Sequence, residues 1–119
     1  MNGKWRIIIY ETLDGDKPAE TFILSLDIKA RNKIVRTLDY LEEFGPELGY
    51  PHLKKLSGTS LWELRILGTD SIRILYITLS GKTFLLLHGF KKKQQKTPSK
   101  EITVAEKRLT EFIKRKKQY

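Results

Sequence analysis

Residues 61–93 contain the pattern that most limits how this chain can fold. The segment reads LWELRILGTDSIRILYITLSGKTFLLLHGFKKK, and Gly68-Thr69-Asp70 and Ser80-Gly81 divide it into three apolar runs. Turn-forming residues between alternating apolar runs are typical of β-hairpins. The segment therefore predicts three consecutive antiparallel strands, and the rest of the chain has to supply the layers that cover them.

The lengths of the two turns predict which side chains are neighbours on this sheet. A three-residue first turn places Arg65 opposite Arg73, and a two-residue second turn places Arg73 opposite His88. Like charges that face each other across strands are destabilising, by roughly 0.2 to 1 kcal/mol for an ordinary pair. A bound anion would offset that repulsion, so the register indicates a phosphate site with one titratable group.

Each of these residues also has a purely structural interpretation. Arg65 can pair with Glu63 or Glu47. Arg73 can be a solvated strand residue, and His88 can be a strand histidine with satisfied hydrogen bonds. The functional interpretation depends on the coincidence of three residues in one register, and a slip of one residue would turn a strand's side chains to the other face.

Positive charge is concentrated at one end of the chain. The sequence carries 23 Lys and Arg and 14 Asp and Glu, a net charge of +9. Residues 1–90 hold 12 basic and 11 acidic side chains, whereas residues 91–119 hold 11 and 3, so +8 of the +9 follows Phe90. A charge this concentrated predicts a polyanionic partner, either a nucleic acid or an acidic protein.

The N-terminal part of the chain predicts one strand and two helices. Residues 4–10 (KWRIIIY) are β-branched and apolar, which favours a strand. Pro18 suits a first helical turn, and apolar residues at helical spacing follow it with a break near Asp27. The second helix continues to Phe44, where Gly45-Pro46 ends it, although one long helix also fits the pattern.

The segments on either side of the three strands predict a connection and a final helix. Residues 45–60 are rich in Gly, Pro and Ser and form a long loop of the kind that often carries function. Thr97 or Ser99 can cap a C-terminal helix. The order strand, helix, helix, three strands, helix gives one α+β domain over residues 1–119, with two N-terminal helices packed on an antiparallel sheet.

Composition excludes several classes of protein. The chain has no cysteine and two histidines, so we expect no disulfide, no metal site and no cofactor. Its apolar runs are shorter than a membrane span, and Met1 to Lys4 lead into a strand rather than a signal peptide. We therefore expect a soluble, cytoplasmic protein without a membrane partner.

Three blocks of sequence resemble a known group of proteins. The segments HLKKLSGTSLWELRI, IRILYI and LLLHGFKKKQQKTPSKEITVAEKRL follow one another in an order similar to the RelE/ParE toxin superfamily, and within it the phage-derived, HigB-like branch. The resemblance runs from about Tyr10 to the last helix. It implies a RelE-like fold and the toxin of a type II toxin–antitoxin system, a ribosome-dependent mRNA endonuclease (mRNA interferase). Its partners would be the ribosome, mRNA and a cognate antitoxin of helix-turn-helix type.

The resemblance also assigns roles by position. Metal-independent cleavage of RNA needs a base for the ribose 2′-OH, cations for the phosphorane and an acid for the leaving 5′-oxygen. Arg65 and Arg73 match the strand arginines that bind the scissile phosphate. His88, Lys91 and Lys93 lie where members place acid–base and phosphate residues, and we expect His88 to be the acid or the base.

Further basic residues complete the predicted site. The second proton-transferring group stays open between a lysine with a depressed pKa and His52. The residues expected to bind RNA are Lys54, Lys55, Lys92 and Lys96. Two other functions remain alternatives: a ParE-like inhibitor of DNA gyrase, and a non-catalytic nucleic-acid-binding or structural phage protein.

Overall fold

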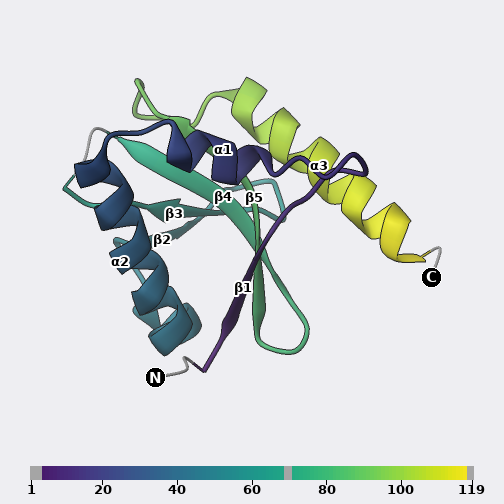
Figure 1. Ribbon diagram of the computed structural model, residues 1–119, viewed down its shortest axis with the longest axis horizontal. Coiled ribbons are helices and arrows are strands. Elements are labelled where there is room, and N and C mark those ends of the chain that lie inside the picture. Colours follow the sequence, from purple (N-terminus) through teal and green to yellow (C-terminus); the bar gives the residue numbers. More distant parts are fainter. Residues whose placement is uncertain (1–3, 69–70, 118–119) are drawn as a thin grey trace.

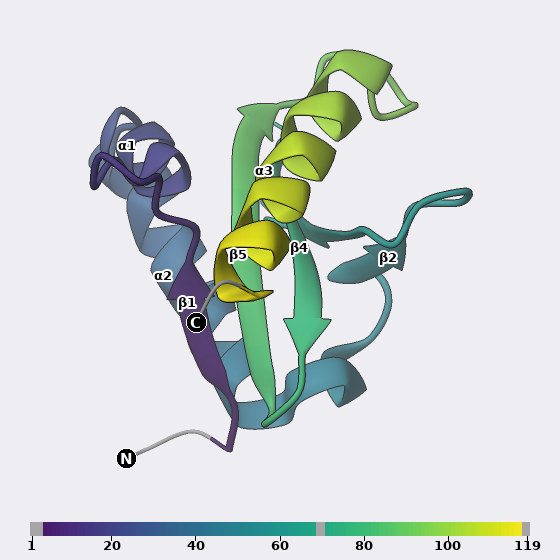
Figure 2. The ribbon, with the colours of Figure 1, turned by 90° about the vertical axis from the view of Figure 1, so that its right-hand side faces the viewer.

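A five-stranded sheet lies between two helical layers in the computed structural model, which describes residues 4–68 and 71–117 (Figure 1). The elements are β1 (Arg6–Ile9), α1 (Pro18–Leu24), α2 (Ile28–Phe44), the 3₁₀ helix η1 (Gly45–Leu48), β2 (Leu53–Lys55), β3 (Trp62–Arg65), β4 (Ile72–Leu79), β5 (Thr83–Lys91) and α3 (Ser99–Lys117). Figure 2 shows α3 in front of β5 and β4, with α1 and α2 on the far side of the sheet. The predicted α+β class is confirmed.

The sheet is mixed rather than antiparallel throughout. Its strand order is β1-β5-β4-β3-β2, and β1 runs parallel to β5 while the other pairs are antiparallel. The chain leaves β1 through two helices, reaches the far edge at β2 and returns by hairpins, which brings β5 alongside β1 in the same direction. The prediction of an antiparallel sheet is therefore wrong at this edge.

The segment 45–60 is also more ordered than a loop. It contains η1 and the short strand β2, whose Leu53 is buried and pairs with Leu64 of β3. Lys54 and Lys55 of β2 are exposed. β2 forms the second edge of the sheet, and it brings Lys54 close to the side chains of β3.

The boundaries of the two N-terminal helices agree with those that the sequence predicts. Pro18 occupies the first turn of α1, where a missing backbone N–H costs nothing. Asp27 caps α2, because its side chain accepts a hydrogen bond of 2.8 Å from the backbone N–H of Ala30. Gly45 ends α2 with a positive φ of 58°, and a Cβ there would lie 2.3 Å from the Trp5 indole nitrogen.

Each face of the sheet has its own hydrophobic core. The core beneath α1 and α2 includes Ile34, Leu41, Leu64, Ile74, Tyr76, Phe84 and Leu86. The core beneath α3 includes Leu61, Leu75, Leu85, Leu87, Ala105 and Leu109. Burial on both faces explains why β4 and β5 read as nearly continuous apolar runs.

The pairing of β4 with β5 contains two irregularities that the sequence does not reveal. Leu79 pairs with Thr83, so the turn has three residues rather than two. Register then shifts between Leu75 and Tyr76, which pair with His88 and Leu86. Leu87 is the extra residue of this β-bulge, which inserts one residue into one strand of the pair.

These irregularities place His88 away from Arg73. Arg73 lies opposite Phe90, and Leu75 lies opposite His88, so the predicted Arg73–His88 pair is wrong. The bulge also reverses the alternation of β5. Leu87 belongs to the core beneath α3, and His88 is hydrogen-bonded to α3 residues, whereas without the bulge it would share the face of Leu86.

Gly89→Ala is expected to lower the free energy of unfolding by about 1 to 3 kcal/mol, the usual cost of overpacking. A Cβ at Gly89 would lie 2.5 Å from Cδ2 of Phe22 in α1, too close for a carbon contact. Urea denaturation measures the change. In a Phe22→Leu background the same substitution should cost less, because the smaller side chain leaves room; equal costs in both backgrounds would contradict the proposed clash.

Candidate anion-binding site

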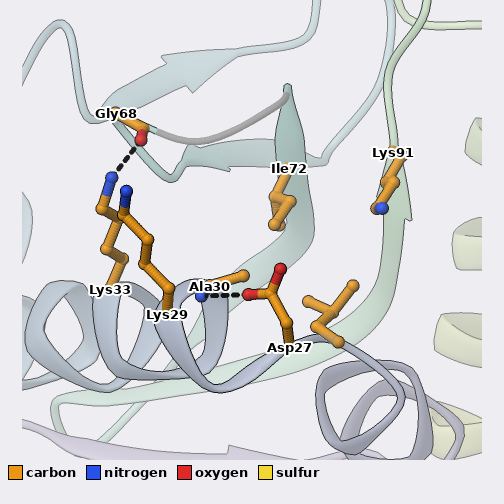
Figure 3. Close-up of a pocket in the computed structure, with 8 residues that line it drawn as sticks. Asp27, Lys29, Ala30, Lys33, Gly68, Ile72 and Lys91 are labelled. Carbon is orange, nitrogen blue, oxygen red and sulfur yellow. Dashed lines mark hydrogen bonds between the residues drawn. The ribbon is translucent and has the colours of Figure 1, made fainter.

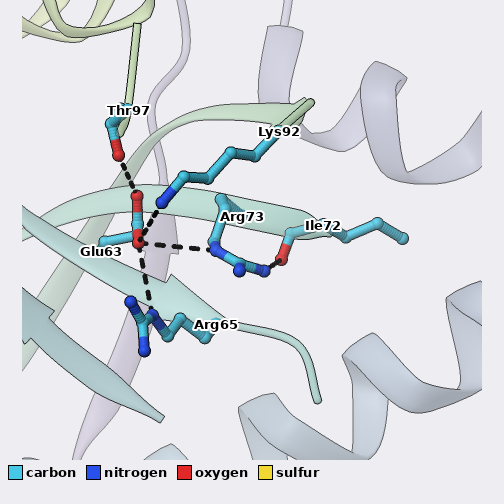
Figure 4. Close-up of polar contacts among 6 residues, drawn as sticks. All are labelled: Glu63, Arg65, Ile72, Arg73, Lys92 and Thr97. Atoms are coloured by element: carbon cyan, nitrogen blue, oxygen red, sulfur yellow. Dashed lines mark hydrogen bonds and ion pairs between the residues drawn. The ribbon is translucent and has the colours of Figure 1, made fainter. Parts of the chain in front are cut away.

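A buried carboxylate organises the polar end of the α3 face of the sheet. Glu63 of β3 is 0% exposed. Its Oε1 lies 3.5 Å from Nε of Arg65, 3.5 Å from Nε of Arg73 and 4.0 Å from Nζ of Lys92 (Figure 4). Its Oε2 accepts a hydrogen bond of 2.5 Å from the hydroxyl of Thr97. One carboxylate therefore contacts three cations and one hydroxyl group.

The predicted alignment of Arg65 with Arg73 is confirmed, and its electrostatic cost is offset from within the protein. The two residues are register partners on β3 and β4. Glu63 lies on the same face and contacts both guanidinium groups, which supports the structural interpretation of Arg65 as a partner of Glu63. An external anion is therefore not needed to relieve the repulsion, and Arg73 is half-buried rather than solvated.

A wide, open pocket of about 790 Å³ lies over this cluster. Its walls come from β2, β3, the start of β4 and the loop after β5. The lining residues are Lys54, Arg65, Ser71, Arg73, Lys92, Lys93, Gln94 and Gln95. Five of these eight side chains are cationic and none is acidic, so the pocket is suited to an anion whose size and shape allow several contacts.

Lys92 is the buried lysine among the residues that line the pocket. Its side chain is 5% exposed, and this burial lowers the pKa of its ammonium group. Glu63 raises that pKa, while the positive charges of Arg73, Arg65 and Lys54 lower it further. A lysine with a lowered pKa is able to exchange a proton nearer to neutral pH than an ordinary lysine.

Lys91 lies on the opposite face of the sheet. It lines a separate small pocket at the start of α2, together with Asp27, Lys29 and Lys33 (Figure 3). Lys33 donates a hydrogen bond to the backbone carbonyl of Gly68 there. Because neighbouring residues at the end of a strand point to opposite faces, Lys91 and Lys92 are separated although they are adjacent in sequence.

His88 is held beneath α3 and does not line the cationic pocket. Its Nε2 lies 2.8 Å from Oε1 of Glu101, and its Nδ1 lies 3.1 Å from Nη1 of Arg108. A guanidinium only donates, so Nδ1 accepts and Nε2 carries the proton that goes to Glu101. Burial lowers the pKa of His88, which favours this neutral form. The arrangement matches a strand histidine with satisfied hydrogen bonds.

The remaining predicted residues do not line the main pocket. Lys55 and Lys96 line a smaller adjoining pocket that shares Lys54 and Lys92 with the main one. The ammonium group of Lys55 is hydrogen-bonded to backbone carbonyls of its own loop. His52 is half-buried and is not among the residues that line the pocket.

Four residues that the sequence does not single out contribute to the site. Thr97 is one of the two residues predicted as possible caps of α3, but the helix begins at Ser99 and the Thr97 hydroxyl binds Glu63. Gln94 and Gln95 supply neutral hydrogen-bonding groups to the pocket wall. Tyr50, which is 75% exposed, lies beneath the Arg65 guanidinium with 5.5 Å between the guanidinium carbon and the ring centre.

Residues 4–68 and 71–117 contain no group of three or more His, Cys, Asp or Glu side chains placed to hold a metal ion. Within the same residues, no helix has the length and apolar character needed to cross a membrane.

Comparisons with known proteins place this chain in a family. Residues 21–110, three quarters of the chain, match the family model described as "Phage derived protein Gp49-like (DUF891)". The chain belongs to this family. Among solved structures, the fold of the Gp49-like chain is similar to a chain of the archaeal RelE–RelB complex from Pyrococcus horikoshii OT3. The TM-score is 0.57 at 19% identity, over 76% of this chain and 98% of that one. A search of curated proteins gave no match.

These comparisons bear out the predicted resemblance at a coarser level. The phage-derived family and the RelE-like fold agree with it. Placement in the HigB-like branch stays a prediction.

Lowering the pH from about 7.5 to 5.5 is expected to destabilise the Gp49-like chain through His88. Its folded pKa lies below its ordinary value of 6.5, so the unfolded chain binds more protons between the two pKa values. Stability is therefore fully present above pH 6.5 and falls as the pH is lowered towards the folded pKa. Urea denaturation at both pH values measures the loss.

Substitution of His88 tests this effect directly. His88→Gln should reduce the loss of stability between the two pH values. An equal loss in the wild-type protein and in His88→Gln would contradict the assignment.

Proposed function

We propose that this Gp49-like protein is the toxin of a type II toxin–antitoxin system and cleaves mRNA on the ribosome. The observation that carries the proposal is the cationic pocket over Arg65, Arg73 and Lys92, on a fold similar to that of the RelE–RelB complex. An RNA backbone presents phosphates at regular intervals, and a pocket with five cationic residues suits such a polyanion.

The residues of the pocket divide into two chemical roles. Arg65 and Arg73 hold the scissile phosphate and the negative charge that develops when the 2′-oxygen attacks phosphorus. Lys92, with its lowered pKa, transfers a proton, as the base for the 2′-OH or as the acid for the leaving 5′-oxygen. Lys54 and Lys93 contact phosphates on either side.

Two residues that the resemblance implies as catalytic are less suited to these roles. Lys91 lies across the sheet from the pocket. His88 is engaged at both ring nitrogens by α3 residues. Lys92, rather than His88, is therefore the proton-transferring residue, and Lys91 lies outside the site.

The RelE–RelB complex also supports an antitoxin as partner. The pocket is strongly cationic, so the matching surface of an antitoxin would be acidic. Covering the pocket would exclude RNA and thereby neutralise the toxin. Co-expression with the cognate antitoxin should restore growth to cells that express this chain.

Purified protein is expected to cut mRNA on a translating ribosome and to leave free RNA largely intact. The pocket supplies cations and a proton-transferring lysine, while the ribosome would supply the ordered placement of the codon that such chemistry needs. Primer extension measures cutting in three reactions: free mRNA, ribosome-bound mRNA, and ribosome-bound mRNA with chelator-treated, desalted protein.

Three other outcomes would contradict this prediction. Robust cutting of free RNA would contradict ribosome dependence, and loss of activity only after chelation would contradict metal-independent chemistry. If expression arrests DNA replication while translation continues, the chain acts as a ParE-like gyrase inhibitor.

Replacing Lys92 or Lys93 with glutamine is expected to flatten the salt dependence of RNA binding. Each lost phosphate contact lowers the slope of log affinity against log salt by about 0.7 to 0.9. Lys91→Gln is the matched control, because it removes the same charge from the opposite face. Fluorescence anisotropy with a short RNA across a salt series measures the three slopes. An equal change for Lys91→Gln would show that only net charge matters.

A further inference from the structure

Glu63 connects the two parts of the chain that supply the pocket. Its Oε1 is directed to the strand arginines and Lys92, and its Oε2 to Thr97, near the end of the basic loop after β5 (Figure 4). We propose that Glu63 is the positioning residue of the site: it fixes the strand arginines relative to the loop lysines so that they act on one phosphate. The catalytic part of this proposal rests on the function proposed above.

The contact between Glu63 and the two arginines has a specific form. The carboxylate approaches Nε in both cases, which is the guanidinium nitrogen nearest to the main chain. Nη1 of Arg73 donates a hydrogen bond of 3.0 Å to the carbonyl of Ile72, which further fixes the plane of that guanidinium. Nε of Arg65 donates a hydrogen bond to Oε1, whereas the buried Nε of Arg73 has no hydrogen-bond partner among the described residues and pairs with Oε1 by charge. Contact at Nε leaves terminal nitrogens available for a ligand in the pocket, where bidentate contact with phosphate is strongest.

The buried position of Glu63 makes this arrangement rigid. A carboxylate that is 0% exposed cannot be solvated by water, so it has to keep its charged and hydrogen-bonding partners. Breaking one contact leaves a buried charge less compensated, which penalises every alternative orientation of the arginines. An exposed ion pair would impose no such restriction.

The Thr97 contact extends the restriction to the basic loop. Lys92 and Lys93 leave the end of β5, and the loop returns to the sheet at Thr97, which is itself 7% exposed. The hydroxyl of Thr97 binds the same carboxylate that Lys92 approaches. Both ends of the loop that carries Lys93 are therefore attached to Glu63.

Glu63 also favours the charged form of Lys92, against the burial that lowers the pKa of this lysine. The charged groups that face the Lys92 ammonium are Glu63 and Arg65 from β3, Arg73 from β4 and Lys54 from β2. Glu63 is the acidic member of that set and opposes the three cations. Removing its charge should therefore favour the neutral amine of Lys92 and move any step that needs this amine to lower pH.

Two substitutions test separately the charge of the Glu63 carboxylate and the hydrogen bond that its Oε2 accepts. Glu63→Gln keeps the shape and removes the charge, whereas Thr97→Val removes only the hydroxyl that binds Oε2. Thr97→Ser is the conservative control, since it restores that hydroxyl. Circular dichroism and urea denaturation establish which variants are folded, and Thr97→Val keeps the proposal testable if Glu63→Gln does not fold.

The first readout does not depend on cleavage. The Nε–H signals of Arg65 and Arg73 in ¹H–¹⁵N NMR spectra should be protected from exchange in the wild-type protein and lose protection in Glu63→Gln. Titration with inorganic phosphate should perturb both signals in the wild-type protein. It should perturb them less in Glu63→Gln, because the guanidinium groups no longer share one orientation.

The second readout uses ribosome-bound mRNA. A positioning role predicts that kcat falls by about 100-fold in Glu63→Gln while KM changes less, because small misplacements cost catalysis more than binding. It also predicts that the pH profile moves to lower pH in Glu63→Gln. Thr97→Val should lower kcat without moving the profile, and Thr97→Ser should recover the wild-type rate.

The outcomes distinguish this proposal from the proposed function. If the wild-type protein does not cut mRNA, the proposed function fails, and the NMR and phosphate readouts still decide the role of Glu63. If the wild-type protein cuts and folded Glu63→Gln keeps its kcat, pH profile and Nε–H protection, Glu63 is not a positioning residue. Loss of stability alone, with unchanged kcat, would likewise overturn the proposal.

Discussion

Arg73→Ala is expected to lower the rate of mRNA cleavage by about 100- to 1000-fold, the usual cost of losing one charged donor to a transition state. Arg73 lines the pocket and is held by Glu63 and by the carbonyl of Ile72, so its guanidinium has a defined place next to a bound phosphate. Single-turnover cleavage of ribosome-bound mRNA measures the effect.

The same substitution should also reduce stability. From the sequence alone, removal of a repelling arginine would leave stability unchanged or raise it. The structure reverses that expectation, because Glu63 loses one of its three cations inside the protein. We expect the free energy of unfolding to fall by about 1 to 3 kcal/mol, the range for an uncompensated buried polar group.

An exposed arginine on the opposite layer provides the matched control. Arg36 of α2 is exposed, and Arg36→Ala removes the same charge from the chain. It should change neither cleavage nor stability appreciably. A folded Arg73→Ala protein that cuts at the wild-type rate would exclude Arg73 from the site.

Lys92→Met is expected to lower cleavage by about 100- to 10,000-fold, the contribution of a positioned acid or base. The substitution keeps an unbranched side chain of similar length in a position that is 5% exposed in the wild type. Measurement of the single-turnover rate from pH 6 to 10 should show that the limb assigned to Lys92 disappears.

Lys92→Arg separates charge from proton transfer. Arginine keeps the positive charge, but its guanidinium does not lose a proton at these pH values. RNA affinity should therefore stay close to that of the wild type while cleavage remains low. Wild-type cleavage by Lys92→Arg would show that Lys92 contributes only its charge, and the proton-transferring group would have to be sought elsewhere.

The sequence predicted those features of the fold that depend on local chemistry. The helix break at Asp27 follows from its capping side chain, and the pairing of Arg65 with Arg73 follows from the length of the first hairpin loop. Residues 69 and 70 of that loop lie outside the described residues. Glu63 and Arg65 lie two residues apart on β3 and share one face, as alternation along a strand requires.

Features that depend on tertiary structure could not be predicted from the sequence. No residue type in the apolar run of β5 indicates the bulge at Leu87. The longer turn shifts the partner of His88 by one residue, and the bulge shifts it by one more. Lys91 and Lys92 point to opposite faces of the sheet because the extended backbone of β5 continues to Lys91. The buried contact of Thr97 with Glu63 joins segments 34 residues apart, and a helix cap was the simpler local interpretation.

The parallel pairing of β1 with β5 also determines when the sheet can be completed during synthesis. Arg6 pairs with Thr83, 77 residues later in the chain. At about 5 to 20 residues per second, translation takes roughly 4 to 15 s to cover that distance. During this time β1 lacks its partner strand, and neither Lys92 nor Thr97 exists. The pocket is therefore completed only after β5 emerges, so a nascent chain that stops before this strand lacks the proposed site.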